Sequence, residues 1–262
     1  MSLRKKEILD KNLFIFDIDG TIKNGDRLVE YFLPFLETIE AKGRPYCFLS
    51  NNTSLSKTDH LRNLSNLLDR ELTARHLFTP LDQVKNHLSR RALNRIYLLG
   101  TGSVQALFKG HGFELTDENP EAVVVTFDTS LDYQKLSTAS RLLMDPSVEF
   151  ILANKDLRCP TEFGFIPDAG SIANMLKATT GREIDYTGGK PSTEMMQAIL
   201  DAWEVHPGGC VFFGDRLYTD IPLGEAAGIL TVLVLTGETK LSDLGPENDI
   251  PVLRSYQELL DG

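Results

Sequence analysis

Short apolar runs alternate with longer segments of helical periodicity along this chain, and this alternation constrains the fold more than any other feature. The expected strands are Leu13–Phe16, Tyr46–Leu49, Arg95–Leu99, Ala122–Phe127, Glu149–Ala153, Cys210–Phe213 and Thr231–Leu235. The expected helices are Leu28–Lys42, Lys57–Leu68, Tyr133–Met144, Ser171–Thr179, Ser192–Trp203 and Ile221–Ala227. Alternation of this kind predicts an α/β fold with a mainly parallel sheet covered by helices. Runs that are apolar on both faces, such as VVVTF, are typical of strands buried on both sides.

Two segments resemble linkers and divide the chain. They are Leu77–Pro80 and Thr180–Gly189, the second of which is rich in glycine and polar residues. The sequence between them has its own strand–helix alternation, which predicts a second α/β domain inserted into the first. We therefore expect a discontinuous core domain, residues 1–78 and 185–262, and an inserted domain, residues 79–184. A length of 262 residues is compatible with two modest domains.

Charge and cysteine content exclude several classes of protein. The formal net charge of −10 argues against non-specific nucleic-acid binding, which needs lysine and arginine to neutralise phosphates. Three cysteines without CxxC spacing favour free thiols over a disulfide framework or a zinc site. No apolar run approaches the roughly 20 residues that span a bilayer, and the amino-terminal segment is polar and charged. We expect a cytoplasmic protein that binds neither nucleic acid nor membrane.

Polar side chains follow three of the expected strands at the point where each strand ends. Asp17 and Asp19 follow the first run, and residues two apart on a strand point to the same side. Ser50 follows the second strand, and Asp215 follows Cys210–Phe213. Ligands of open α/β sheets bind at the carboxyl ends of the strands, so we expect these groups to share one site.

These residue types fit a phosphate site that contains a metal ion. Three acids, Asp17, Asp19 and Asp215, offer the hard oxygen ligands that Mg²⁺ prefers. Lys190, between Gly189 and a proline, adds a positive charge for a phosphate. The cation and the lysine would also offset the repulsion between the acids and stabilise charge on a transferring phosphoryl group.

The ordered segments resemble the four-motif set of the haloacid dehalogenase (HAD) superfamily. They are DIDGT at residues 17–21, SNN at 50–52, KP at 190–191 and GDRLYTD at 214–220. The 140 positions between residues 50 and 190 leave room for a whole domain, which is the pattern of class II caps. The segments NKD at 154–156 and PDAG at 167–170 are similar to the NagD-like, p-nitrophenylphosphatase-like subgroup. The resemblance implies a Rossmann-like HAD core with an inserted α/β cap.

What the resemblance implies for the chemistry is a Mg²⁺-dependent phosphatase that hydrolyses a small phosphate monoester. Sugar phosphates, nucleotides and phosphoglycolate-type compounds all remain open as substrates. Asp17 would be the nucleophile that forms an aspartyl-phosphate. Asp19 would protonate the leaving oxygen and then activate water. The metal would be held by Asp17, the main-chain carbonyl of Asp19, and Asp215.

The resemblance also implies residues that bind phosphate and substrate. Ser50, Asn51, Asn52 and Lys190 would bind the phosphate group, and Asp220 would orient Lys190 or a metal-bound water. In the cap, Asn154 and Asp156 are expected to face the substrate. A homodimer is left open by the resemblance.

Other functions compete with hydrolysis. A phosphomutase or phosphotransferase of the same superfamily would share the aspartyl-phosphate and differ only in the acceptor. A receiver-like signalling domain also clusters aspartates, a hydroxyl residue and a lysine around Mg²⁺. Such a domain would need only about half of this chain, and it gives no reason for Asp19 or for the insertion. A catalytically inactive binding protein would have no reason to keep every one of these groups.

Overall fold

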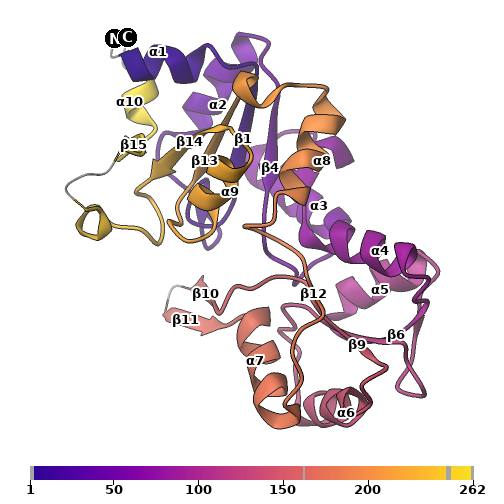
Figure 1. The fold of residues 1–262 in the computed structure, drawn as a ribbon. Coiled ribbons are helices and arrows are strands. Elements are labelled where there is room, and N and C mark those ends of the chain that lie inside the picture. Colours follow the sequence, from indigo (N-terminus) through magenta and orange to yellow (C-terminus); the bar gives the residue numbers. More distant parts are fainter. Residues whose placement is uncertain (1–2, 162, 246–248, 261–262) are drawn as a thin grey trace. The chain divides into compact units, whose positions relative to one another are not determined.

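The computed structural model describes residues 3–161, 163–245 and 249–260 (Figure 1). The chain divides into two compact units. The first unit comprises residues 1–50, 61–78 and 190–262, and the second comprises residues 51–60 and 79–189. The domain boundaries given above, 1–78 with 185–262 and 79–184, stay a prediction.

A six-stranded parallel sheet forms the centre of the first unit, in the order β15-β14-β13-β1-β4-β5 (Figure 1). Its strands are β1 (Leu13–Asp17), β4 (Tyr46–Leu49), β5 (Leu77–Phe78), β13 (Cys210–Gly214), β14 (Leu230–Val234) and β15 (Val252–Leu253). All five residues of β1 are buried, because helices cover both faces of the sheet.

Apolar side chains alternate between two cores on either side of this sheet. Phe14 and Phe16 of β1 pack in a core with helix α2, while Leu13 and Ile15 pack with helix α8 on the opposite face. The helices of this unit are α1 (Leu3–Leu9), α2 (Phe32–Ala41), α8 (Glu194–Trp203), α9 (Asp220–Ala226) and α10 (Gln257–Leu260). Helix α3 (Lys57–Leu68) adds Leu64 to the core of α2. Period-two alternation on buried strands thus fixes which side chains face each helical layer.

The second unit contains a five-stranded parallel sheet in the order β12-β9-β8-β6-β7. Its strands are β6 (Arg95–Leu99), β7 (Glu114–Leu115), β8 (Ala122–Val125), β9 (Glu149–Leu152) and β12 (Tyr186–Thr187). Its helices are α4 (Pro80–Arg90), α5 (Gly102–Gly110), α6 (Tyr133–Leu143) and α7 (Ala169–Thr180). Helices α6 and α7 share a core with one face of the sheet, and α4 and α5 share a core with the other.

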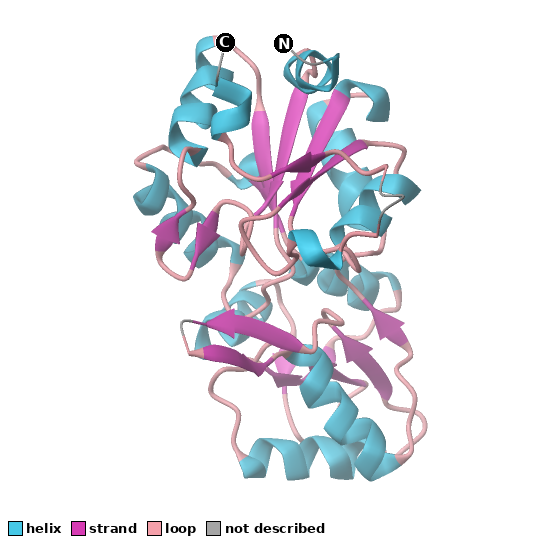
Figure 2. Ribbon diagram, turned by 90° about the vertical axis from the view of Figure 1, so that its left-hand side faces the viewer, coloured by secondary structure: helices cyan, strands magenta, loops and turns pink. Residues whose placement is uncertain are grey.

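Two short antiparallel hairpins lie outside these sheets (Figure 2). In the first unit β2 (Lys23–Asn24) pairs with β3 (Arg27–Leu28). In the second unit β10 (Arg158–Thr161) pairs with β11 (Gly164–Pro167). Three 3₁₀ helices complete the described elements: η1 (Ala74–His76), η2 (Pro207–Gly209) and η3 (Leu241–Asp243).

All seven expected strands are present, with ends that differ by at most two residues. The expected helix Leu28–Lys42 begins later, at Phe32, because Leu28 pairs in the β2–β3 hairpin and Tyr31 adopts a left-handed φ of 63°. The segment Leu77–Pro80 is not a plain linker, since Leu77 and Phe78 form strand β5 and Pro80 begins α4. Proline suits the first turn of a helix, where its missing N–H would have no partner.

No helix among the described residues is long and apolar enough to cross a membrane. The three cysteines, which all lie in the described part, are free thiols, as expected. The cytoplasmic location stays a prediction.

Candidate active site

The carboxyl ends of three neighbouring strands carry the predicted polar groups of the first unit. Asp17 is the last residue of β1, Ser50 directly follows β4, and Asp215 directly follows β13. The parallel register pairs Phe16 with Phe213 and Asp17 with Leu49, so the three strand ends lie at one level of the sheet (Figure 1). Asp17, Ser50 and Asp215 thus lie at the same edge of the sheet, whereas Asp19 lies two residues beyond the end of β1. That all four residues share one site stays a prediction.

Aromatic packing holds the end of β1 in place. The ring of Phe16 stacks on Phe213 with centroids 5.0 Å apart, and it meets Phe32 edge-on at 5.2 Å. Burial of such rings contributes more than any other side-chain type to a core. The residue that follows, Asp17, therefore has a strand end that cannot move freely.

Lys190 joins two of the acids. Its ammonium group donates hydrogen bonds to Asp17 Oδ1 and, over 2.7 Å, to Asp220 Oδ1. Asp220 Oδ2 in turn accepts from the backbone N–H groups of Asp215 at 3.1 Å and Arg216 at 3.0 Å. Asp17 is 5% exposed, and Asp215, Asp220 and Lys190 are at most 1% exposed. We call Asp17, Asp215 and Asp220, together with Lys190, the acidic cluster.

Two glycines leave room for the side chain of Asp215. A Cβ atom added at Gly20 would lie 2.2 Å from Asp215 Oδ2, and one added at Gly237 would lie 2.0 Å from the same atom. Gly20 also has a φ of +92°, which other residues rarely adopt. Asp215 Oδ2 accepts a hydrogen bond of 2.6 Å from the backbone N–H of Glu238. The other oxygen, Oδ1, is buried without a hydrogen-bond partner among the described residues.

Burial and crowding change the acidity of the cluster. Desolvation by burial raises the pKa of Asp17 from 3.8 to about 6; Lys190 opposes this rise and Asp220 adds to it. Burial also raises the pKa of Asp215 well above its ordinary value, and the negative charges of Asp17 and Asp220 add to the effect. Burial alone would lower the pKa of Lys190, but its two carboxylate partners raise it above the ordinary value. The single lysine of the cluster thus supplies less positive charge than three ionised acids would need.

The acidic cluster fits a divalent cation. Asp17, Asp215 and Asp220 each offer a carboxylate oxygen, and these oxygens lie within 4.8 Å of one another. The unpartnered Oδ1 of Asp215 is a buried acceptor of the kind that a metal ion satisfies. Hard oxygen donors are those that Mg²⁺ and Ca²⁺ take. The cluster is therefore a candidate metal site of buried carboxylates.

Asp19 lies apart from the acidic cluster in its contacts. Its Oδ1 accepts a hydrogen bond of 2.5 Å from Lys23 of strand β2, and its side chain is 27% exposed. The cluster of possible metal ligands contains the Asp220 carboxylate as its third member, in place of the Asp19 carboxylate that the residue types suggested. The family resemblance implies a contribution of Asp19 through its main-chain carbonyl instead. The contacts of the side chain are compatible with that division.

The second motif is divided between the two units. Ser50 belongs to the first unit and is 2% exposed, and its backbone N–H donates to Phe78 of β5. Asn52 belongs to the second unit, where its side-chain oxygen accepts from the backbone N–H of Ser54 at 2.9 Å and from the Ser54 hydroxyl at 2.7 Å. Such a turn is a common use of asparagine.

Asn51, Asn154, Asp156 and Asp168 form a second buried group, which we call the amide cluster. The amide nitrogen of Asn51 donates to Asp156 Oδ1 at 3.0 Å. The amide nitrogen of Asn154 donates to the backbone oxygen of Asn51 and, at 3.4 Å, to Asp168. All four residues are at most 5% exposed and belong to the second unit. The structure thus brings the predicted residues Asn51, Asn154 and Asp156 together.

Sequence reasoning missed several residues around Asp17 and Asp215. Thr21 donates its hydroxyl to Asp17 Oδ2 at 3.2 Å. Gly237 and Glu238 lie in the loop after strand β14, which neighbours β13 and whose end was not considered. The same rule that selected the ends of the other strands would have found them.

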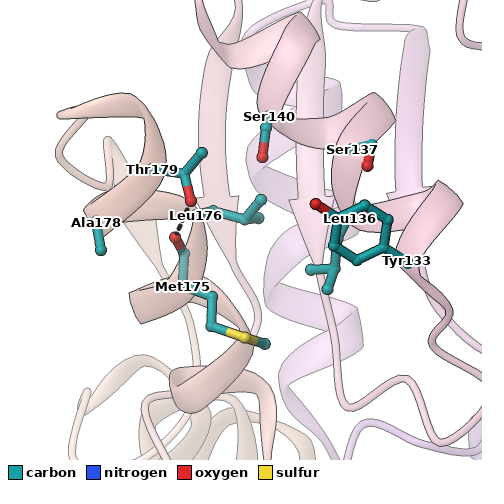
Figure 3. Close-up of a pocket in the computed structure, with 8 residues that line it drawn as sticks. All are labelled: Tyr133, Leu136, Ser137, Ser140, Met175, Leu176, Ala178 and Thr179. Carbon is teal, nitrogen blue, oxygen red and sulfur yellow. Dashed lines mark hydrogen bonds between the residues drawn. The ribbon is translucent and has the colours of Figure 1, made fainter.

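A cavity of about 430 Å³ lies between α6 and α7 of the second unit (Figure 3). Its lining includes Tyr133, Leu136, Met175 and Leu176. None of the predicted site residues lines it, and its lining has no charged side chain. This cavity therefore offers hydroxyl groups, such as those of Ser137 and Ser140, but no cation for a phosphate.

Two family descriptions match the chain. One, haloacid dehalogenase-like hydrolase, matches residues 14–114, and the other, HAD-hydrolase-like, matches residues 187–259. Together they cover the strands and loops that carry the acidic cluster.

Relatives and solved structures resemble almost the whole chain. The 4-nitrophenylphosphatase of Thermotoga maritima, known from a crystal structure, is 37% identical in sequence to this chain. The two structures have a TM-score of 0.88, and the match covers 97% of each chain. NagD of Escherichia coli K-12 is 28% identical with a TM-score of 0.81, covering 95% of this chain and 98% of that one. The 5′-nucleotidase YutF of Bacillus subtilis is 29% identical over 239 residues, which are 91% of this chain and 92% of that protein. The chain therefore belongs to the haloacid dehalogenase-like hydrolases and is a phosphatase of their NagD and p-nitrophenylphosphatase subgroup.

Proposed function

We propose that this protein is a Mg²⁺-dependent phosphatase that hydrolyses small phosphate monoesters through an aspartyl-phosphate. The observation that carries the proposal is the buried acidic cluster, in which Lys190 contacts both Asp17 and Asp220 beside the unpartnered oxygen of Asp215. The names of the related 5′-nucleotidase and 4-nitrophenylphosphatase, both monoester phosphatases, support the substrate class.

In the first half of the reaction, a carboxylate oxygen of Asp17 attacks the phosphorus atom and the bond from phosphorus to the ester oxygen breaks. Asp19 gives its proton to the departing oxygen, which leaves as an alcohol. Lys190 and Ser50, with the backbone amide of Asn51, bind the phosphate oxygens and stabilise their charge. Asn52 is proposed to support this phosphate-binding loop.

In the second half, a water molecule attacks the phosphorus atom of the aspartyl-phosphate. Asp19, now ionised, takes the proton from this water. The bond between Asp17 and phosphorus breaks, which restores the Asp17 carboxylate and releases inorganic phosphate. Asp220 acts through its contact with Lys190, which it holds beside Asp17.

Asp17 and Asp215, with the main-chain carbonyl of Asp19, would hold Mg²⁺. The ion would supply positive charge against the phosphate and against the carboxylates that crowd this site. Asn154 and Asp156 are proposed to bind the substrate in the second unit. A homodimer stays a proposal without a structural argument.

The test is a screen of phosphate monoesters with and without Mg²⁺, measuring kcat/KM from released phosphate. We expect turnover of several monoesters that stops when the metal is chelated. Transfer of phosphate to an alcohol without release into water would favour the phosphotransferase alternative. Absence of Mg²⁺-dependent release from every monoester would reject the proposal. Because the chain belongs to the HAD family, the receiver-like alternative is set aside.

Asp19→Asn separates the proton transfer from binding. The amide N–H is far too weak an acid to protonate the departing oxygen, so turnover should fall by about 10²- to 10⁴-fold. Binding of Mg²⁺ and of phosphate should change far less, because the main-chain carbonyl of residue 19 is kept. Equal losses of binding and turnover would show that Asp19 is not the acid and base.

A further inference from the structure

Glu238 holds Asp215 from the loop that follows strand β14. Its backbone N–H donates to Asp215 Oδ2 at 2.6 Å. The next backbone N–H, that of Thr239, donates to the main-chain oxygen of Asp215 at 3.3 Å. This loop therefore contacts both the carboxylate and the main-chain oxygen of Asp215.

The side chain of Glu238 fastens the same loop to the residues that follow Asp215. Glu238 Oε2 lies 3.2 Å from Arg216 Nε and accepts a hydrogen bond of 3.0 Å from the hydroxyl of Tyr218. The side chains of Arg216 and Glu238 are 9% and 12% exposed, so solvent screens their ion pair only weakly. A single carboxylate thus connects the loop after β14 to the loop after β13.

These contacts decide which oxygen of Asp215 is left for a metal ion. Oδ2 is bonded to Glu238 and lies where the missing side chains of Gly20 and Gly237 would be. Oδ1 is buried and has no hydrogen-bond partner in the described part of the chain. Asp215 is therefore held with one oxygen occupied and the other available.

We propose that Glu238 is a positioning residue that sets the affinity of the protein for its divalent cation. Its carboxylate, held by Arg216 and Tyr218, keeps the loop in place and so keeps Oδ1 of Asp215 directed to the cation. This inference rests on the proposed function, because only there is Asp215 a metal ligand. Groups that orient metal ligands typically change affinity by about 10- to 100-fold when they are lost.

The chain offers a matched control for Glu238. Glu40 also accepts a hydrogen bond of 3.0 Å from a tyrosine hydroxyl, that of Tyr46, and lies 3.2 Å from an arginine Nε, that of Arg70. Tyr46 begins strand β4, at the end of the sheet opposite to the site. Glu40→Gln thus removes the same kind of carboxylate without touching Asp215.

The experiment is a calorimetric titration of each protein with Mg²⁺ in the absence of substrate. We expect Glu238→Gln to raise the Mg²⁺ dissociation constant by about tenfold or more. Tyr218→Phe should raise it less, because Arg216 still holds Glu238, and Glu40→Gln should leave it unchanged. In activity assays, the Mg²⁺ concentration for half-maximal rate should rise with the dissociation constant, while kcat at saturating Mg²⁺ changes less.

Two results would overturn the inference and are distinct from failure of the proposed function. One is an unchanged Mg²⁺ dissociation constant in Glu238→Gln; the other is an equal rise in Glu40→Gln, which would indicate general destabilisation. In both cases the unaltered protein still binds Mg²⁺ and releases phosphate. If the unaltered protein binds no Mg²⁺ at all, the proposed function and the inference both fail.

Discussion

Each unit of the protein contains a buried polar cluster described above, and these two clusters are built differently. The acidic cluster of the first unit consists entirely of ionisable groups, and its only lysine does not offset the three acids. The amide cluster of the second unit combines two asparagine amides with two carboxylates, and it connects through hydrogen bonds to the backbone. Both are buried to the same degree, so burial alone does not identify the candidate metal site.

Hydrogen bonding alone does not separate the clusters either, because each holds a buried oxygen without a partner among the described residues, Asp215 Oδ1 and Asn154 Oδ1. In the acidic cluster, burial raises the pKa values of Asp17 and Asp215, which means that their charged forms are destabilised until a cation arrives. In the amide cluster, Asn51 and Asn154 bring donors to the acceptors around them. Perturbed acids of this kind gather at functional sites, which favours the acidic cluster as the place of metal binding.

The prediction with the largest effect tests whether Asp17 acts as the nucleophile or is only a buried acid. Asp17→Asn removes the nucleophile, so kcat for p-nitrophenyl phosphate should fall by at least about 10³-fold. The matched variant is Asp128→Asn in the second unit, because Asp128 is also buried and its Oδ2 pairs with Lys135 at 2.8 Å. Asp128→Asn should retain turnover. Mg²⁺-dependent phosphate release by Asp17→Asn would contradict the role of this residue.

Much of this fold could be predicted from the sequence because buried parallel strands are apolar on both faces. Strands β4 and β6 and helix α3 lie at their predicted bounds. Short edge strands such as β5, β7 and β12 were not predicted, because two residues are too few to show a period. Helices α4 and α5 were also missed, although Pro80 and Thr101 mark their starts.

The site could be predicted from the sequence where its residues lie at the ends of strands. Asp17, Ser50 and Asp215 follow that rule, and their shared sheet edge was expected. The bond from Lys190 to Asp220 and the contact of Glu238 with Asp215 depend on loop conformation, which no period in the sequence encodes. The mutual contacts of Asn51, Asn154 and Asp156 arise from residues more than 100 positions apart, so only the folded chain shows them.

The next prediction compares the loss of two lysines that each pair with a buried acid. Lys190→Met leaves Asp17 and Asp220 without their shared cation, which should lower the free energy of unfolding by about 3–5 kcal/mol in metal-free protein. Lys135→Met removes the partner of Asp128, but the side chain of Lys135 is 23% exposed. Water can approach where the lysine was, and Ser130 still donates two hydrogen bonds to Asp128, so the loss should be smaller than for Lys190→Met. Urea unfolding in chelator measures both losses, and equal losses would show that the pairs of Lys190 are no more costly to break than the pair of Lys135 with Asp128.

A third effect concerns pH. The pKa of Asp17 is 3.8 ordinarily and about 6 in the folded chain, so the folded state binds more protons than the unfolded state between these values. This group therefore lowers the free energy of unfolding as pH rises from about 4 to 6, by about 3 kcal/mol in total. Other acids also titrate near pH 4, so the measured quantity is the difference between the unaltered protein and Asp17→Asn.

That difference should be followed by urea unfolding in chelator from pH 4.5 to 7.5. We expect the unaltered protein to lose stability relative to Asp17→Asn as pH rises, and we expect added Mg²⁺ to reverse the loss. A difference that stays constant with pH would show that Asp17 is not destabilised by its surroundings.

The smallest effect concerns the amide cluster. Asn154→Ala removes the donor to the backbone oxygen of Asn51 and to Asp168, leaving buried acceptors unsatisfied. The free energy of unfolding should fall by about 1–3 kcal/mol, while the exposed control Asn94→Ala should change it by less than about 0.5 kcal/mol. The Mg²⁺ dissociation constant should not change in either variant, because the amide cluster supplies no carboxylate to the candidate metal site. A Mg²⁺ dissociation constant that rises in Asn154→Ala would show that the two clusters act together, and a KM that rises at constant Mg²⁺ affinity would support substrate binding by Asn154.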